Sequence, residues 1–302
     1  MRTVYLGTSE FAAAVLERLA ASTHRPALVV TRPDRPRGRG RRLEAPPVAE
    51  AASRLGIELT QPDAVNSDES RAAIAGAEPE RAVICAYGAL IRDPLLSEHE
   101  FLNVHPSLLP RWRGAAPIER AIEAGDEETG VSIMRLVAEL DAGPVCLQRP
   151  EPIRPEDDFG SLWPRLAALG AELLVEALET RPAFSDQPEQ GVTYAAKIER
   201  EERRLDPARP ATELARRVRA LSPHVGTFVE LGDEARLGVR RAAPTSDPGG
   251  PAPGELRSRD TRLLFGAADG ALELLEVQPP GGRAMPAGDW LRGHGAALAP
   301  GS

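Results

Sequence analysis

Two polar residues, Asn103 and His105, stand two positions apart at the end of the apolar run Phe101 to His105. Alternate residues of a β-strand point to the same side, so both side chains are expected on one face. An asparagine amide can donate to a developing oxyanion, and an imidazole exchanges protons near neutral pH. The proline-containing loop that follows marks the carboxyl end of the strand, where open α/β sheets bind ligands. For His105 taken alone, a structural histidine is the alternative.

A third candidate, Asp141, lies in the turn Leu140 to Pro144, whose Gly-Pro pair can hold a carboxylate in a fixed direction. Its charge can orient His105 and favour the protonated ring. A plain turn residue is the alternative interpretation of Asp141 taken alone. Asn103, His105 and Asp141 together predict addition chemistry at a carbonyl group, without a metal ion or a covalent nucleophile.

The elements that must position these residues alternate in type over about the first 150 residues. Apolar residues recur at helical spacing from Phe11 to Leu19. Strands that alternate with helices predict an α/β fold with a mostly parallel sheet and helices on both faces. The buried strands are expected at 4–6, 28–31, 82–87 and 101–105.

The rest of the chain has a different pattern. A polar stretch punctuated by prolines runs from Thr180 to Pro210, and one helix and several short strand-like segments follow it. Short strands separated by turn signals predict a small β-barrel-like domain. We place the boundary near residue 205, which gives domains of residues 1–204 and 205–302.

One segment, Arg32 to Arg42, holds six arginines and a single acid, Asp34. Its prolines and glycines at positions 33, 36, 38 and 40 predict that it forms neither helix nor strand. A solvated basic loop is the plain interpretation. The functional alternative is a flexible arginine-rich segment that becomes ordered on a phosphate backbone.

The formal net charge of −8 argues at first against a nucleic-acid partner, but the charges are unevenly distributed. From Arg203 onward 14 arginines balance 12 acids, so the acidity belongs to the N-terminal part. The two cysteines, Cys85 and Cys146, fit neither a disulfide framework nor a zinc site, and Cys85 is expected to be buried. No apolar stretch reaches the length of a membrane span. A cytoplasmic protein that does not bind membranes is therefore predicted.

Several blocks along the chain resemble the 10-formyltetrahydrofolate-dependent formyltransferase family. The most specific is the run Asn103-Val104-His105-Pro106-Ser107-Leu108-Leu109-Pro110 and its continuation to Ile118, which Leu140-Asp141-Ala142-Gly143 follows. The resemblance covers nearly the whole chain. Its other blocks are Gly7 to Ala12, Arg32 to Leu43, Ala86 to Ile91, Glu128 to Met134 and Val192 to Lys197.

The resemblance implies a Rossmann-like catalytic domain followed by an OB-fold-like domain that binds tRNA. It also implies a reaction in which the free amino group of methionyl-initiator tRNA attacks the formyl carbon of 10-formyltetrahydrofolate. Asn103, His105 and Asp141 are then the catalytic residues, no metal takes part, and the protein is expected to be a monomer. The folate site is implied to be lined by Tyr87, Gly88, Ser107, Leu108, Leu109 and Pro110. The tRNA is implied to contact Arg35, Arg37, Arg39, Arg41 and Arg42.

Three alternatives stay open. An amino-sugar N-formyltransferase would use the same catalytic residues, but the arginine segment and the block Arg111 to Gly114 favour a tRNA acceptor. A non-catalytic RNA-binding protein would not need the intact set of catalytic residues, and a formyl-folate hydrolase would not need the basic segment. The second domain departs from the family pattern, because Ser222 to Gly226 replaces an aromatic Asn-Pro-Trp-Pro-like stretch and lysine is absent from residue 205 onward. These departures concern its tRNA contacts rather than catalysis.

Overall fold

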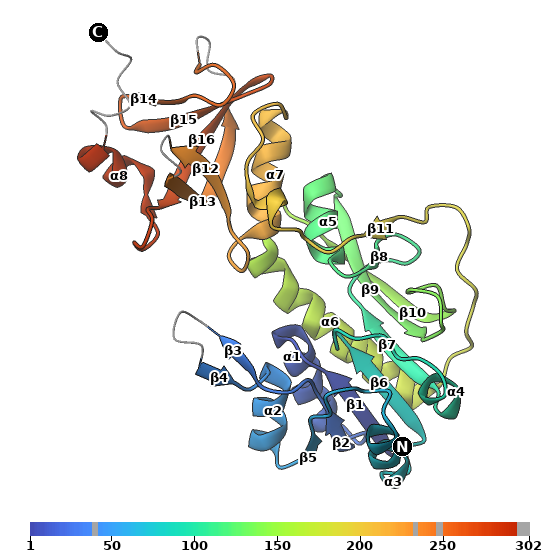
Figure 1. Cartoon of the computed structure of the whole chain (residues 1–302). Coiled ribbons are helices and arrows are strands. Elements are labelled where there is room, and N and C mark those ends of the chain that lie inside the picture. The colour runs from blue at the N-terminus through green and yellow to red at the C-terminus, as the bar shows by residue number, and fades with distance from the viewer. Residues whose placement is uncertain (38–41, 232–234, 246–249, 295–302) are drawn as a thin grey trace. The chain divides into compact units, whose positions relative to one another are not determined.

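The computed structural model describes residues 1–37, 42–231, 235–245 and 250–294. Its N-terminal part is organised by a sheet of seven strands, labelled in Figure 1. These strands are β1 (Thr3–Gly7), β2 (Pro26–Val30), β5 (Glu58–Thr60), β6 (Arg81–Cys85), β7 (Phe101–His105), β9 (Glu128–Arg135) and β10 (Val145–Pro152). Their order across the sheet is β10-β9-β7-β6-β1-β2-β5. The five strands from β7 to β5 run parallel, and β9 and β10 add an antiparallel edge.

Helices cover both faces of this sheet because its central strands are apolar on both sides. Val4 and Leu6 pack in one cluster with Ile74 and Leu95, whereas the Tyr5 hydroxyl, on the opposite face, donates to the Ala12 carbonyl at 2.6 Å. The predicted α/β fold class is thus confirmed. The helices of the N-terminal part are α1 (Glu10–Ala20), α2 (Pro47–Leu55), α3 (Asp68–Gly76), α4 (Leu95–Glu98) and α6 (Phe159–Thr180). Helix α5 (Pro117–Ala124) groups, apart from Pro117, with the C-terminal part of the chain.

The arginine segment differs from its prediction. Two short strands, β3 (Arg35–Arg37) and β4 (Arg42–Glu44), pair antiparallel, with Pro36 opposite Leu43. The expectation that the segment contains no strand was therefore wrong. Proline is tolerated because a two-stranded ribbon consists only of edge strands, where a missing N–H can face away from the partner.

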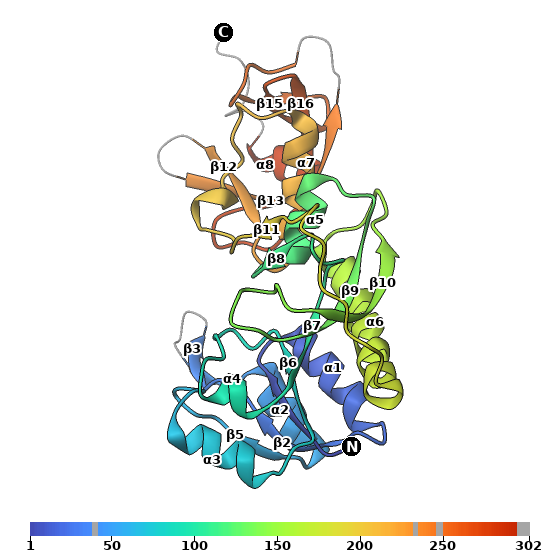
Figure 2. The same cartoon turned by 90° about the vertical axis from the view of Figure 1, so that its right-hand side faces the viewer.

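The C-terminal part is a curled antiparallel sheet, as the barrel-like pattern predicted (Figure 2). Its order is β12-β13-β16-β15-β14, with β17 beside β16. Leu214 and Val218 of one helix pack on Leu237 and Val239 of the sheet. The elements are η1 (Glu201–Arg203), α7 (Ala211–Leu221), β12 (Thr227–Leu231), β13 (Ala235–Thr245), β14 (Leu256–Arg259), β15 (Arg262–Ala267), β16 (Gly270–Gln278), β17 (Met285–Pro286) and α8 (Ala287–His294).

The chain divides into two compact units. The first contains Met1–Pro117, Glu128–Pro152 and Trp163–Ala195, and the second contains Ile118–Glu127, Ile153–Leu162 and the chain from Ala196 onward. The small pair of β8 (Arg113–Gly114) and β11 (Tyr194–Ala195) belongs to the first unit. None of the helices in the described residues is long and apolar enough to cross a membrane.

Both cysteines are free, and burial suppresses their reactivity. Burial raises the pKa of Cys85 to about 12 and that of Cys146 to about 11. A rise of two units leaves about a hundredth of the ordinary thiolate fraction at pH 8. We therefore expect iodoacetamide to label the folded chain far more slowly than the denatured chain, as followed by intact mass. Rapid labelling of Cys85 in the folded protein would contradict its predicted burial.

Candidate active site

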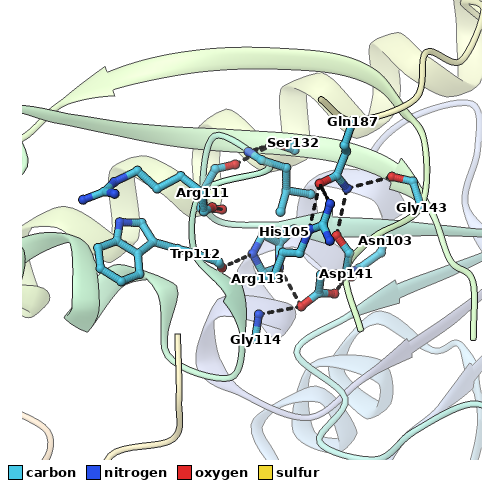
Figure 3. A network of polar contacts seen from close by, with 12 residues as sticks. Asn103, His105, Arg111, Trp112, Arg113, Gly114, Ser132, Asp141, Gly143 and Gln187 are labelled. Carbon is cyan, nitrogen blue, oxygen red and sulfur yellow. Dashed lines mark hydrogen bonds and ion pairs between the residues drawn. The ribbon is translucent and has the colours of Figure 1, made fainter. Parts of the chain in front are cut away.

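The carboxyl end of β7 and the β9–β10 connection bring the three predicted catalytic residues together (Figure 3). Asn103 and His105 share one face of β7, as their spacing predicted. The Asn103 amide donates from Nδ2 to Asp141 Oδ1 at 3.3 Å. His105 Nδ1 lies 3.7 Å from Asp141 Oδ2. The side chains of Asn103 and His105 therefore both reach the same carboxylate.

The Asp141 carboxylate is fixed by a backbone donor as well. The Gly114 N–H donates to Asp141 Oδ2 at 2.8 Å. Asp141 is only 8% exposed and has a φ of +46°, in the left-handed region that non-glycine residues rarely adopt. A buried carboxylate with such contacts is stable in its charged form only where donors and cations surround it.

The ring of His105 is oriented by the backbone at its other nitrogen. His105 Nε2 lies 2.8 Å from the carbonyl oxygen of Trp112, which can only accept, so Nε2 carries a hydrogen. In the neutral ring Nδ1 is then an unprotonated acceptor that faces a carboxylate, whereas in the imidazolium it is a donor. The Trp112 carbonyl therefore holds the ring so that Nδ1 faces the Asp141 carboxylate.

The loop after β7 is held down by side chains of the antiparallel edge. Ser132 Oγ donates to the Ser107 carbonyl at 2.6 Å and accepts from the Leu109 N–H at 3.1 Å. Gln148 Nε2 donates to the Leu109 carbonyl at 2.7 Å. Ser107 and Leu109 are buried, and Leu108 and Pro110 are partly exposed. The side chains of this stretch that can meet a ligand are thus those of Leu108 and Pro110.

Tyr87 and Gly88 follow β6, the neighbour of β7 in the sheet. The Tyr87 carbonyl accepts from Thr8 Oγ1 at 2.7 Å, and the Gly88 carbonyl accepts from Arg32 Nη1 at 3.0 Å. Burial raises the pKa of the Tyr87 hydroxyl to about 12, so it stays a neutral donor. A cavity of about 220 Å³ adjoins this loop and is lined by residues that include Arg32, Tyr87, Ala89, Leu90 and Arg92.

The arginines predicted to contact tRNA are only partly described. Arg35 lies on β3 and is exposed. Arg37 is the last residue of β3 and Arg42 the first of β4, and the two pair in register. Arg39 and Arg41 lie outside the described residues.

Sequence reasoning missed Gln187 and associated Arg113 with the tRNA acceptor rather than with this network. Gln187 Nε2 donates to the carbonyls of Asp141 and Gly143, at 2.8 Å each. Its Oε1 accepts from Arg113, a buried residue of β8. Gln187 lies in a stretch without regular structure, where no periodicity could single it out. Among the described residues, no group of three or more His, Cys, Asp or Glu side chains is arranged to hold a metal ion.

The α/β fold with a cluster of polar side chains at a strand end defines an α/β protein with a candidate active site, and family models give its class. Residues 1–178 match the model described as formyl transferase, and residues 197–295 match the formyl transferase C-terminal domain. The chain therefore belongs to the formyl transferase family.

Within that family its relatives are methionyl-tRNA formyltransferases. The protein of that name from Ruegeria pomeroyi is 44% identical, with 97% of each chain covered. The one from Methylococcus capsulatus is 45% identical, with 98% of each chain covered. A solved N-formyltransferase from Helicobacter canadensis shares the fold at 13% identity with a TM-score of 0.66, covering 90% of this chain and 98% of that one.

Proposed function

We propose that the protein transfers the formyl group of 10-formyltetrahydrofolate to the free amino group of methionyl-initiator tRNA, in support of translation initiation. The observation that carries this proposal is the convergence of Asn103 and His105 on the buried Asp141 carboxylate, in a chain of the formyl transferase family. The names of relatives at 42–45% identity over nearly the full chain support the choice of acceptor.

Each of the three side chains has a distinct task in this proposal. Asn103 has two amide hydrogens, and the bond to Asp141 uses one. The second hydrogen and the His105 ring stabilise the negative charge that develops on the formyl oxygen as the amine attacks. Removing one such donor costs about 10²- to 10³-fold in rate. Asp141 holds His105 charged and, directly or through water, accepts the proton that the attacking amine releases. The bond between the formyl carbon and N10 then breaks, and N10 of the departing tetrahydrofolate takes up a proton. Because that amine must be neutral to attack, activity falls in acid.

The folate supplies the formyl group at its N10 position, and two loops are the proposed place for it. The loop at Tyr87 and Gly88 follows β6, and the stretch from Ser107 to Pro110 follows its neighbour β7. Three features suit a flat ring system with polar edges. Gly88 has a φ of +81° with open space where a side chain would lie, and Leu90, 57% exposed, offers an apolar surface. The third feature is the cavity, which Tyr87, Ala89 and Leu90 of the first loop line.

We assign catalysis to residues 1–204 and tRNA binding to residues 205–302, with Arg35, Arg37, Arg39, Arg41 and Arg42 of the first part as further tRNA contacts. The boundary is supported by the core of the C-terminal sheet, whose first buried residue is Leu205. The same proposal places the protein in the cytoplasm, a reducing compartment in which its two cysteines stay free. It also includes a monomeric state. Gel filtration with light scattering tests the monomer.

Replacing Arg41 and Arg42 together with glutamine tests the arginine segment. Loss of two cations proposed to bind phosphates weakens tRNA binding, whereas every residue proposed to contact the folate is unchanged. We expect KM for methionyl-tRNA to rise at least about tenfold, with a weaker salt dependence, and KM for the folate to stay unchanged. Equal losses for both substrates in steady-state assays would contradict the assignment. Replacing Arg25 and Arg54, which lie elsewhere in the same unit, provides the matched control for a change in net charge.

The function itself is tested by one assay. Labelled formyl from 10-formyltetrahydrofolate should appear on methionyl-initiator tRNA and far less on elongator methionyl-tRNA. Uncharged initiator tRNA should inhibit the transfer. Transfer to a nucleotide-linked amino sugar without inhibition by tRNA would instead show the sugar enzyme, and release of free formate would show a hydrolase. Absence of folate binding would leave an RNA-binding protein.

A further inference from the structure

The side-chain amide of Gln187 has all of its hydrogen-bonding groups engaged at the turn that carries Asp141 (Figure 3). Its two N–H groups reach the carbonyls of Asp141 and Gly143, at 2.8 Å each. Its oxygen accepts twice from one guanidinium, from Arg113 Nε at 3.0 Å and Arg113 Nη2 at 2.8 Å. A primary amide offers two donors and two acceptor positions, so all four are used.

This arrangement leaves one orientation for the amide. A flipped amide would place NH₂ against the guanidinium and its oxygen against two carbonyls, which opposes every contact. Arg113 is 8% exposed, so its charge is largely removed from water and needs acceptors. Arg113 forms a long ion pair, in which its Nη1 lies 3.8 Å from the carboxylate of the exposed Glu139. Gln187 is thus the main polar partner of a buried cation.

Gln187 binds the backbone of a turn, Asp141 to Gly143, whose conformation is unfavourable without such contacts. Asp141 has a φ of +46°, and a non-glycine residue keeps such a conformation only where its surroundings hold it there. Gly143 packs closely against the Arg135 backbone, since an added Cβ would lie 1.9 Å from the Arg135 carbonyl oxygen. Two hydrogen bonds from one side chain therefore bracket the turn on both sides of Ala142.

The same elements reach the carboxylate of Asp141 from its other end. Gly114, the neighbour of Arg113 in β8, donates its N–H to Asp141 Oδ2 at 2.8 Å. Strand β8 pairs with β11, which lies a few residues after Gln187 in the chain. Ser185, two residues before Gln187, exchanges backbone hydrogen bonds with Val145 at 2.8 and 2.9 Å. Two segments therefore hold Asp141: the one that contains Gly114 binds its carboxylate, and the one that contains Gln187 binds its backbone carbonyl.

We propose that Gln187, braced by Arg113, is a positioning residue that sets the Asp141 turn so that its carboxylate lies against His105. Gln187 acts through Asp141 and does not touch the reacting atoms. A displacement of the carboxylate by a fraction of an ångström weakens its hold on the imidazolium without altering either substrate site. The inference rests on the proposed function, because its readout is formyl transfer.

The test uses Gln187→Ala and Gln187→Glu in the full-length protein. Glutamate keeps the contact with Arg113 but places oxygen against both turn carbonyls, so it separates the two sides of the amide. We expect both variants to lower kcat by about 10- to 100-fold, with KM for folate and tRNA within about threefold of the wild type. Full activity of Gln187→Glu would mean that the bond to Arg113 alone matters and would overturn the proposal.

A double-mutant cycle distinguishes positioning from a general structural role. If Gln187 acts through the Asp141 carboxylate, adding Gln187→Ala to Asp141→Asn should lower kcat by less than about twofold more. Equal losses in both backgrounds would overturn the proposal. Ser22→Ala is the control. Ser22 also fixes a turn through its side chain, because its Oγ donates to the Leu19 carbonyl at 2.7 Å and accepts from the His24 N–H at 3.0 Å, but it belongs to none of the proposed sites. The kcat of this variant should stay within about twofold of the wild type.

Failure of the inference and failure of the proposed function give different results. A wild-type chain without formyl transfer would overturn the proposed function. Transfer by the wild type and an equal kcat for Gln187→Ala would overturn the positioning role alone. If Gln187→Ala lowers the melting temperature below the assay range, Gln187→Glu, which retains the partner of the buried Arg113, gives the result.

Discussion

Replacing Asp141 with asparagine is expected to lower kcat for formyl transfer by roughly 10²- to 10⁴-fold. The substitution keeps the shape of the side chain and an oxygen for the Gly114 N–H, but removes the negative charge 3.7 Å from His105 Nδ1. The new NH₂ group of the asparagine would also face the Asn103 NH₂ group, so the hydrogen bond that Asn103 donates to the carboxylate in the wild type is lost. Charge stabilisation and proton acceptance are then both impaired. Steady-state kinetics at saturating tRNA and folate measure the loss.

Asp157→Asn provides the matched control for this experiment. Asp157 is also a buried carboxylate, 3% exposed, and it also accepts a backbone N–H, from Arg154 at 2.8 Å. It lies in the second unit, whereas Asn103, His105 and Asp141, the residues proposed to be catalytic, belong to the first. We expect Asp157→Asn to affect stability but to leave kcat within a few-fold of the wild type. A folded Asp141→Asn variant that turns over like the Asp157 control would refute the assignment of Asp141.

Asn103 and His105 could be predicted from local sequence because the strand that carries them has a period of two. An apolar strand followed by a proline loop predicts the position, and the spacing predicts the shared face. Asp141 was predicted from residue type, turn chemistry and family resemblance. Its contact with His105 depends on β9 pairing with β7, a strand order that no local pattern encodes.

The supporting part of the site could not be predicted in the same way. Trp112 contributes its backbone carbonyl and Gly114 its backbone N–H, and these groups are present in every non-proline residue. Gln187 acquires its role only because a chain without regular structure passes the Asp141 turn. Local reasoning also erred at the arginine segment, where prolines predicted the absence of strands that an all-edge ribbon accommodates.

Replacing Gly114 with alanine is expected to destabilise the protein by about 3 kcal/mol or more and to lower kcat by at least about 10²-fold. Gly114 has a φ of +128°, and an added Cβ would lie 2.6 Å from the carbonyl oxygen of Ala195. That oxygen cannot retreat freely, because it accepts the N–H groups of Ala115 and Ala116 at 2.8 and 3.2 Å. Relief of the clash must therefore separate β8 from β11 and draw the Gly114 N–H away from Asp141.

Gly56→Ala separates the backbone strain from the clash. Gly56 ends α2 with a φ of +64°, and no atom lies within 4 Å of the position that an added Cβ would take there. It should cost only the left-handed conformation, about 1–2 kcal/mol, with unchanged kcat. Denaturant unfolding gives the two stabilities, and kcat is compared below both transitions. If Gly114→Ala is no less stable than Gly56→Ala and equally active, the close approach of β8 to Ala195 does not constrain the site, and the Gly114 N–H is dispensable for holding Asp141.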